Sequence, residues 1–344
     1  MFRNYKTKLL TLNLSFHFFK DPHQMTSLIS PFPLAGFGTM EYVDGTTKDM
    51  TQITINALTA GYRLLDCGEL YESTKQVGAA INSFGMRDEL TIISKLKGMP
   101  VEEDQAALIS RVNAHLSDLQ VKSVDVLLMH WPGPSQCDFN ADAESFKEAA
   151  NAEYYKKNIE KAWNNMILIQ TQGLCQHIGV SNFYRGHLDF LISLCNEKNL
   201  PKPTMNEIFI DPCHPQFDYC DFMKSQNIHV VAYRPLAFIP VMEMAGGMGD
   251  TTHAALVELA AANPDDGDVS KSPHDVVLSW LAKRGITTLV KTASVERCSS
   301  NFASANKGMV IENERELFGA SEMVAMCGGT DPYADVFEEI ATTF

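Results

Sequence analysis

Positive charge is scarce in this chain of 344 residues. It has 28 lysines and arginines against 42 aspartates and glutamates, which gives a formal net charge of −14. A chain this acidic has little nonspecific attraction for nucleic acid or for an anionic membrane. We therefore expect neither partner, and any anionic ligand must be bound by a local cluster of cations.

Closely paired cysteines are also missing. The eight cysteines are scattered along the chain, and no two of them form a C-x-x-C pair. This usage is typical of a reducing compartment such as the cytoplasm, where most cysteines are small buried apolar residues. Cys213, His214 and Cys220 lie close together, but their spacing matches no familiar zinc site, so we predict no metal.

No apolar run approaches the length that a transmembrane helix needs. The first twenty residues contain Arg3, Lys6, Lys8 and Lys20 but no acidic residue. This composition fits either a transit peptide or a disordered extension ahead of Met25, and both interpretations stay open. We expect residues 1–32 to precede a single domain that spans residues 33–344 and ends in a C-terminal tail.

From residue 33 onward, short β-branched runs alternate with longer runs of helical period, which is the pattern of βαβ units around a parallel sheet. Several of the short runs are almost wholly apolar, as strands covered on both faces should be. The predicted strands are Leu34–Gly38, Leu64–Asp66, Leu90–Leu96, Val124–His130, His177–Ser181, Met205–Ile210, His229–Tyr233 and Thr287–Lys291. Eight such units predict one (β/α)8 barrel of the α/β class.

The intervening helices carry ordinary signals. Ser272 before Pro273, with Asp275 at the third helical position, begins a helix that Gly285 ends. Another predicted helix has one apolar face, formed by Ile109, Val112, Leu116 and Leu119. Two long connections, residues 132–160 and 237–254, interrupt the pattern. The glycine-rich stretch 246–249 follows no strand directly, so we interpret it as a mobile loop and not as a phosphate cradle.

Polar residues stand where the predicted strands end. The active sites of parallel barrels lie at this carboxyl edge, so polar side chains there face the mouth of the barrel. One polar strand end means little, but polar ends on all eight strands are harder to dismiss. The residues at these ends are Gly38, Thr39, Asp66, Lys95, His130, Ser181, Asn182, Glu207, Tyr233 and Lys291.

Four residues near these ends, Asp66, Tyr71, Lys95 and His130, can make an acid–base site. A phenol with a pKa of about 10 is a poor acid at neutral pH. A nearby lysine ammonium favours the phenolate and eases proton release, while a carboxylate holds that lysine charged and in place. A histidine nitrogen can orient a carbonyl. Taken singly, each has a structural explanation, such as helix capping for Asp66 or solvation for Lys95.

Five segments together resemble the aldo-keto reductase family. Residues 61–72, Gly-Tyr-Arg-Leu-Leu-Asp-Cys-Gly-Glu-Leu-Tyr-Glu, are similar to its segment G-Y-R-x-x-D-x-A-x-x-Y-x-N-E. Residues 94–96 (Ser-Lys-Leu), 128–132 (Leu-Met-His-Trp-Pro) and 178–183 (Ile-Gly-Val-Ser-Asn-Phe) resemble three more. The spacing of its K-S-x-x-x-x-R-x-x-x-N signature is met by Lys291, Thr292, Arg297 and Asn301. The matches run in order from about residue 33 to about residue 303, and the family fold is the (β/α)8 barrel.

The resemblance implies a catalytic role for four residues. Tyr71 would be the general acid, Lys95 and Asp66 would tune it, and His130 would orient the carbonyl. The implied function is that of an NADPH-dependent oxidoreductase that reduces an aldehyde or ketone to an alcohol. The alternative is a non-catalytic cofactor-binding barrel that acts as a regulatory or structural subunit, and the four intact residues argue against it.

The resemblance also implies where NADPH or NADP⁺ would bind. Ser181 and Asn182 would hold the nicotinamide carboxamide, and Tyr233 would stack on the nicotinamide ring. Two cations at the adenosine end, Lys291 and Arg297, suit a 2′-phosphate, so NADPH is expected over NADH. The full set of expected cofactor-binding residues is Gly38, Thr39, Asp66, Ser181, Asn182, Glu207, Tyr233, Arg234, Leu236, Lys291, Thr292, Arg297 and Asn301.

Several positions depart from the family pattern. Glu207 stands for a glutamine that contacts the carboxamide, and its charge there would favour the oxidised cofactor. The other interpretations are that Glu207 is protonated, turned away, or salt-bridged to Arg234 or another neighbour. The remaining departures are Asp211 for a histidine, Arg234 for a serine, Ser300 for a glutamate and Cys67-Gly68 for a small pair. Neutral drift is an alternative for each.

Three aromatic residues follow the strand ends and could form an apolar wall of the substrate pocket: Trp131, Phe139 and Phe238. The loops 132–160 and 237–254 and the C-terminal tail would line the rest of that pocket. An aromatic residue beside a strand end is as often a packing residue, so this alternative is kept.

Overall fold

The computed structural model describes residues 32–41, 48–101, 104–135, 151–239, 251–262, 272–319 and 342. Several sequence predictions fall outside these residues. They are the N-terminal extension up to residue 31, the pocket residue Phe139, the glycine-rich stretch 246–249 and most of the C-terminal tail.

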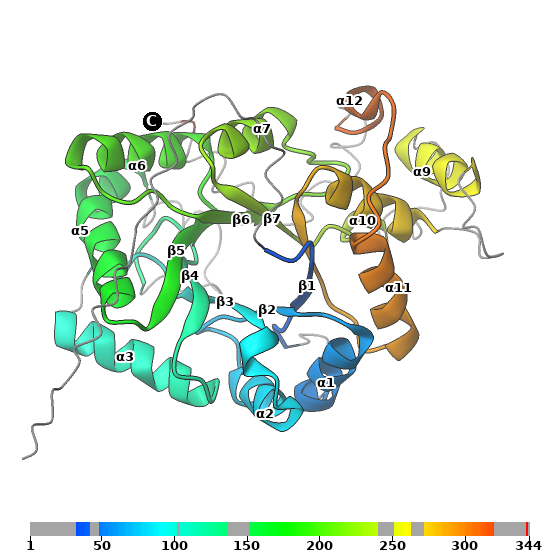
Figure 1. The fold of residues 1–344 in the computed structure, drawn as a ribbon. Coiled ribbons are helices and arrows are strands. Elements are labelled where there is room, and N and C mark those ends of the chain that lie inside the picture. Colours follow the sequence, from blue (N-terminus) through cyan, green and yellow to red (C-terminus); the bar gives the residue numbers. More distant parts are fainter. Residues whose placement is uncertain are drawn as a thin grey trace, which may run out of the picture.

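Eight parallel strands close into a barrel in the order in which they occur along the chain (Figure 1). They are β1 Ala35–Gly38, β2 Leu64–Asp66, β3 Thr91–Leu96, β4 Val124–Met129, β5 Cys175–Ser181, β6 Met205–Phe209, β7 His229–Tyr233 and β8 Thr287–Val290. The barrel is closed by β8, which pairs with β1 through Phe37 and Val290. The prediction of a (β/α)8 barrel is confirmed.

The predicted strands match the observed ones closely, and the differences lie at their ends. β5 begins at Cys175, two residues earlier than predicted, and β4 and β8 stop one residue short of His130 and Lys291. These two polar residues lie just beyond the last paired residue. At this point the chain leaves the sheet, and polar groups at the mouth can contact solvent or a ligand.

Helices surround the barrel (Figure 1). They are α1 Met50–Ala60, α2 Thr74–Phe84, α3 Gln105–Asp118, α5 Ala152–Thr171, α6 Arg185–Lys198, α7 Phe217–Ser225, α9 Thr251–Ala262, α10 Pro273–Lys283, α11 Val295–Ala305 and α12 Glu314–Leu317, with a 3-10 turn, η1, at Arg87–Glu89. The predicted capping box of α10 is present, because the Ser272 hydroxyl accepts from the Asp275 N–H and the Asp275 carboxylate accepts from the Ser272 N–H. Gly285, which follows α10, has a φ of 66°.

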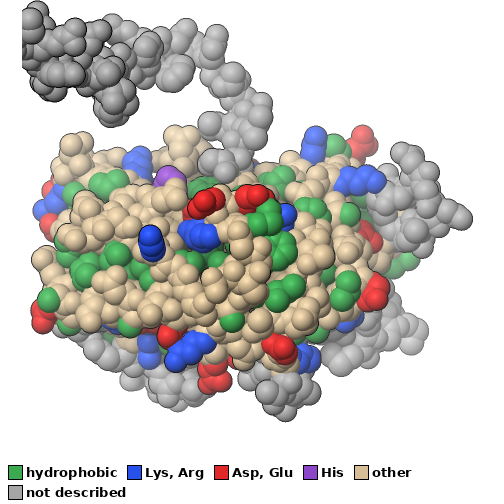
Figure 2. Space-filling view, turned by 60° about the horizontal axis from the view of Figure 1, so that its bottom comes forward, with side chains coloured by type: hydrophobic (Ala, Val, Ile, Leu, Met, Phe, Trp, Pro, Cys, Tyr) green, Lys and Arg blue, Asp and Glu red, His purple; other side chains and the backbone are tan. Residues whose placement is uncertain are grey.

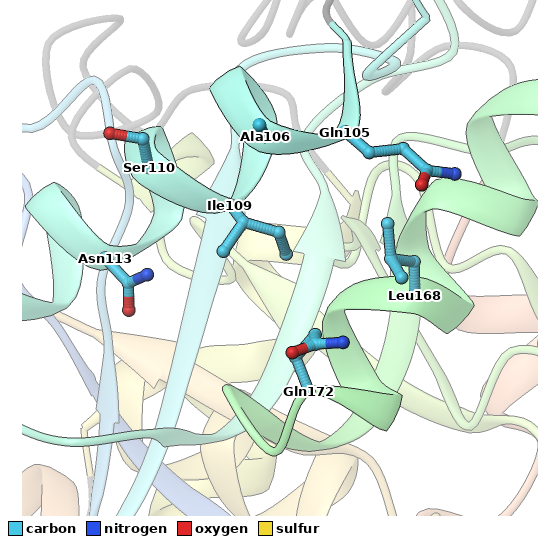
Figure 3. Close-up of a pocket in the computed structure, with 7 residues that line it drawn as sticks. All are labelled: Gln105, Ala106, Ile109, Ser110, Asn113, Leu168 and Gln172. Carbon is cyan, nitrogen blue, oxygen red and sulfur yellow. The ribbon is translucent and has the colours of Figure 1, made fainter.

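One predicted helix face differs from the observed one. Val112, Leu116 and Leu119 are buried, but Ile109 is only partly buried. Ile109 lines a shallow surface groove between α3 and α5, where Leu168 lies on the facing helix (Figure 3). The groove lies on the outside of the barrel, away from its mouth.

The apolar core forms two clusters. The larger one lies between the sheet and the helices. The smaller one fills the inside of the barrel, and we call it the apolar layer; its members are Leu64, Ile93, Val126, Leu128, Met205, Val231 and Leu289. At the amino-terminal end of the strands, the Phe32 ring contacts His177 and His229, with centroids 6.0 and 5.2 Å apart. The barrel is therefore a packed core and not a pore.

Charges on the face shown in Figure 2 are of mixed sign, with acidic and basic side chains interspersed among polar and apolar ones. Within the described ranges, no helix combines the length and the apolar character needed to cross a membrane. The six cysteines in these ranges are all free and buried, as the spacing of the cysteines suggested.

Candidate active site

A layer of polar side chains lies one step above the apolar layer. Successive side chains of a strand point to opposite faces, so residues two apart share a face. The pairs, apolar residue first, are Leu64 and Asp66, Ile93 and Lys95, Leu128 and His130, Met205 and Glu207, Val231 and Tyr233, and Leu289 and Lys291. The alternation that packs the inside of the barrel therefore also delivers polar groups to its carboxyl-terminal mouth.

Lys95 on β3 is the centre of this polar layer. Its side chain is fully buried, and its ammonium donates to the Asp66 carboxylate, to Tyr71 Oη at 3.1 Å and to the Cys67 carbonyl at 3.2 Å. Glu207 Oε1 lies 3.3 Å from the same nitrogen. We call Asp66, Lys95 and Glu207 the charged layer.

The ionisation of Lys95 is set by its neighbours. Burial alone lowers the pKa of an ammonium, but Asp66, Glu207 and Tyr71 outweigh burial and raise the pKa of Lys95 well above its usual value. Burial raises the pKa of the Asp66 carboxyl, and Lys95 opposes that shift. Lys95 therefore stays positive at neutral pH, beside the Tyr71 hydroxyl.

Tyr71 lies in the loop between β2 and α2, three residues before the helix begins, and not at the top of the helix itself. Its N–H donates to the Gly68 carbonyl at 3.0 Å. A Cβ at position 68 would lie 3.1 Å from the ring, so glycine leaves this ring the most room. Burial raises the pKa of Tyr71 above its usual value, and the Lys95 ammonium opposes this shift. The phenol therefore holds its proton at neutral pH.

His130 follows β4 and faces Tyr71. The two ring centroids are 6.0 Å apart with an interplanar angle of 73°. Burial, together with the Lys95 charge, lowers the pKa of His130 well below its usual value. The imidazole is therefore neutral at neutral pH, a state in which one ring nitrogen donates and the other accepts.

A hydrogen-bond network joins the ends of β5, β6 and β7 to His130. The Tyr233 hydroxyl donates to Asn182 Oδ1 at 2.9 Å, and Asn182 Nδ2 donates to the His130 carbonyl at 2.9 Å. Ser181 Oγ donates to the Glu207 carbonyl at 3.0 Å. Asn182 has a φ of 60°, a left-handed conformation that asparagine tolerates better than most residues. The network fixes these side chains at the rim of the barrel.

One interpretation that the sequence left open was a salt bridge between Glu207 and a neighbouring residue. The structure shows such a contact. The neighbour is Lys95 and not the exposed Arg234. The second carboxylate oxygen, Oε2, is buried and has no hydrogen-bond partner. Sequence reasoning did not identify Lys95 as this neighbour. The alternation of β6 gives Glu207 the same inward phase as Met205, but it does not identify the partner.

The residues expected at the adenosine end gather around the end of β8 and the first turns of α11. Lys291 is exposed and donates to the carbonyls of Met40 and Glu41 at 2.9 and 3.0 Å. Arg297 is exposed on α11, whereas Thr292 and Asn301 are buried. After the neighbouring strand β1, the Thr39 hydroxyl donates to the Asp66 carbonyl at 2.8 Å. Gly38 ends β1, and Arg234 and half-buried Leu236 follow β7.

The two expected pocket aromatics within the described residues are both fully buried. Trp131 packs against His130 with ring centroids 5.1 Å apart, and its indole N–H donates to the Pro134 carbonyl at 3.3 Å. Phe238 belongs to the large core cluster. This burial agrees with the alternative that they are packing residues, although Trp131 also supports the His130 ring.

His214, which the sequence places between two cysteines, contacts a carboxylate instead. Its Nδ1 lies 3.0 Å from Asp211 Oδ1, and its backbone N–H donates to the same oxygen at 2.8 Å. Asp211 is one of the departures from the family pattern, and a His-Pro pair follows it three residues later, at His214 and Pro215. Among the described residues, no group of three or more potential ligands is arranged for a metal ion.

The buried Lys95, in contact with Tyr71 and two carboxylates at the mouth of a (β/α)8 barrel, forms a group of residues that can carry out acid–base chemistry. The model of the Aldo/keto reductase family matches residues 35–317. An aldehyde reductase of Saccharomyces cerevisiae, YPR1, is 30% identical over 313 residues, which cover 87% of this chain and 93% of the relative. The glycerol 2-dehydrogenase (NADP(+)) of the same yeast is 29% identical over 81% of this chain and 86% of its own.

Solved structures show the same fold. An aldo-keto reductase from Bombyx mori, determined in complex with NADP, has a TM-score of 0.62 at 23% identity over 87% of this chain and 89% of its own. An aldo-keto reductase from a deep-sea metagenome has a TM-score of 0.63 at 20% identity over 85% of this chain and 93% of its own. The chain belongs to the aldo/keto reductase family. The predicted class, an NADP-dependent oxidoreductase of that family, is confirmed.

Proposed function

We propose that this protein reduces an aldehyde or ketone to the corresponding alcohol, with NADPH as the source of hydride and Tyr71 as the source of the proton. The observation that carries the proposal is the 3.1 Å contact between the Tyr71 hydroxyl and the buried Lys95 ammonium. The names of two yeast relatives, an aldehyde reductase and an NADP(+)-dependent dehydrogenase, point to the same chemistry.

Each of the four polar residues has a definite task in this reaction. NADPH, when bound, would supply a hydride for the carbonyl carbon. Tyr71 gives its proton to the carbonyl oxygen, and Lys95 stabilises the phenolate that remains. Asp66 keeps Lys95 in place through their ion pair. Neutral His130 donates an N–H to the carbonyl oxygen and so orients it toward Tyr71.

The rim of the barrel fits a nicotinamide. Tyr233 has a half-buried ring, while Ser181 and Asn182 place hydroxyl and amide groups beside it. The buried Glu207 Oε2 lacks a partner, and a carboxamide N–H would supply one. Lys291 and Thr292 follow β8, and Arg297 and Asn301 lie on α11, the helix that comes next in the chain. These residues would hold the adenosine and its 2′-phosphate.

The proton-transfer half of the proposal is tested with Tyr71→Phe. We expect carbonyl turnover to fall by about a hundredfold or more, the usual scale for a lost general acid, while NADPH affinity stays within a few-fold. The control is Tyr62→Phe, because the Tyr62 hydroxyl is buried without a hydrogen-bond partner, well away from the site. Single-turnover reduction of a generic aldehyde, followed by NADPH absorbance, measures the effect. Near-normal turnover in Tyr71→Phe would refute the assignment.

The cofactor half is tested with Arg297→Ala. A charge-assisted hydrogen bond contributes roughly 1.5–3 kcal/mol, so NADPH affinity should fall about ten- to a hundredfold while NADH affinity changes little. Arg185→Ala is the control, since Arg185 is also exposed on a helix but pairs with Asp189. Fluorescence titration with both cofactors measures the ratio. Equal losses for NADPH and NADH would mean that Arg297 does not contact the 2′-phosphate.

The alternative, a cofactor-binding barrel without catalysis, predicts a site in which the acid–base contacts are lost. Here Lys95 contacts both Asp66 and Tyr71, which favours the enzyme. We further propose that the partner is a small carbonyl compound and that the protein works in the cytoplasm. The six cysteines that lie within the described residues are free and buried, which supports a reducing compartment.

A further inference from the structure

Lys95 contacts a second carboxyl group, which has no part in the proton transfer proposed above. Asp66 reaches Lys95 from β2, and Glu207 reaches it from β6. The exposed fractions of the three side chains are 0% for Lys95, 6% for Asp66 and 4% for Glu207. Both carboxyl groups therefore lie against one ammonium nitrogen, in a buried site.

The charge of this cluster favours a proton on one of the two carboxyl groups. If both carboxyls were ionised, one ammonium would face two buried negative charges, and like charges that share a site cannot both ionise readily. Glu207 Oε2 has no hydrogen-bond partner, and leaving a charged oxygen buried in that state is costly. A proton on the carboxyl pair removes both costs.

The described residues around the two carboxyl groups supply no second cation. In the part of the chain that the structure describes, Lys95 is the only cation that pairs with Asp66 or Glu207. The strands beside β6 place Ser181 and Val231 opposite Glu207. The other titratable groups that face the cluster are the Tyr71 phenol, the Cys67 thiol and the neutral His130 imidazole.

We propose that Asp66 and Glu207 share one proton at neutral pH, and that Glu207 is a positioning residue whose deprotonation weakens Tyr71 as a proton donor. With the proton present, the pair carries one negative charge, which Lys95 balances. When the proton leaves to solvent, the added negative charge near Tyr71 opposes formation of the phenolate. The inference rests on the proposed function, since it assigns Glu207 an effect on the acid step of that reaction.

The pH range follows from the burial of Glu207. Burial, and then the charge of Asp66, raises the pKa of Glu207 to about 8. The Glu207 charge in turn raises the pKa of Tyr71. Carbonyl reduction should therefore be supported below about pH 8 and decline as the pH rises through that value.

The first experiment compares the pH profile of kcat/KM for reduction in the native protein and in Glu207→Gln. Glutamine keeps the shape of the side chain but cannot titrate. We expect the alkaline midpoint to move upward by about one pH unit or more, the scale of a removed neighbouring charge. The control, Glu160→Gln, removes an exposed carboxylate on α5 and should leave the profile unchanged. An unchanged midpoint in Glu207→Gln would overturn the inference.

A second measurement needs neither turnover nor the variant's stability. Infrared difference spectroscopy of the native protein detects the C=O stretch of a protonated carboxyl, which we expect at pH 6 and which should disappear with a midpoint of about 8. If no carboxyl of the native protein titrates near that pH, the inference is wrong. Tyr71→Phe distinguishes a failure of this inference from a failure of the proposed function. If Tyr71→Phe reduces carbonyls normally, the proposed role of Tyr71 is wrong, whatever the infrared titration shows.

Discussion

The inside of the barrel contains two consecutive layers that obey different physics. The apolar layer is held by burial, which has no direction and does not depend on pH. The charged layer lies two residues further along the same strands, and each of its members needs a specific partner, because a buried charge without one is very costly. The comparison shows that one alternating strand pattern builds both the apolar layer and, two residues further along, a charged layer whose properties depend on pH.

The largest expected effect comes from removing the cation of the charged layer. Lys95→Met leaves the Asp66 and Glu207 carboxyls buried without a positive charge, and breaking a buried pair in this way costs about 3–5 kcal/mol of stability. We expect this loss of stability at pH 8 or above, where the two carboxyl groups are not both protonated. Carbonyl turnover should be lost as well. Denaturant unfolding measures it.

The control for Lys95→Met is Lys75→Met, which removes an exposed lysine that lies 3.8 Å from Asp118. An exposed pair of this kind contributes about 0–1 kcal/mol. If the two variants lose the same free energy of unfolding, the ion pairs of the charged layer contribute no more to stability than an exposed ion pair does.

A smaller effect should appear in the pH dependence of stability. Because the folded pKa of Glu207 is about 8 and the ordinary value is 4.5, folding favours its protonated form. The stability that this proton contributes is fully present below about pH 4.5 and is lost as the pH rises through about 8. Glu207→Gln removes this slope.

Unfolding free energies of the native protein and of Glu207→Gln should therefore diverge in favour of the variant as the pH is raised from 5 to 9. Denaturant midpoints at fixed ionic strength across that range provide the test. Parallel curves would show that Glu207 is ionised throughout, as an ordinary surface glutamate would be.

The smallest effect belongs to the apolar layer. Ile93→Val removes one methylene directly below Lys95 and should cost about 0.5–1.5 kcal/mol at every pH, because no charge is involved. Turnover should stay within about twofold of the native value. A pH-dependent loss of stability or a large drop in turnover would show that the two layers are coupled through packing.

The fold was predictable because the inner strands are almost wholly apolar and alternate regularly with helices. An apolar run such as residues 124–129 has few stable conformations other than a buried strand. The strand ends were predicted to within a residue or two. The position of the site was also predictable, because polar residues at strand ends meet at one edge of a parallel barrel. The order of Asp66, Lys95 and His130 along the chain was enough to place them there.

The partner of Glu207 was not predictable from sequence. Alternation gives Glu207 the inward phase, but it does not say which inward group a strand meets across the barrel. Resemblance to the family assigned Glu207 to the cofactor, since a glutamine usually stands there. The contact with Lys95 depends on the three-dimensional closure of β3 and β6 around one axis. The burial of Trp131 and Phe238 was equally hidden, because side-chain exposure is a property of the packed barrel.

The pairing of β1 with β8 has a consequence for how the chain is made. The Thr287 hydroxyl donates to the Pro33 carbonyl, across 254 positions of sequence. A ribosome therefore releases seven strands before the eighth exists, and until then β1 and β7 each present a row of unsatisfied N–H and C=O groups. Open edges of this kind invite pairing with other chains. The barrel can therefore close only after Thr287–Val290 has emerged, and until then these two edges lack their last partner.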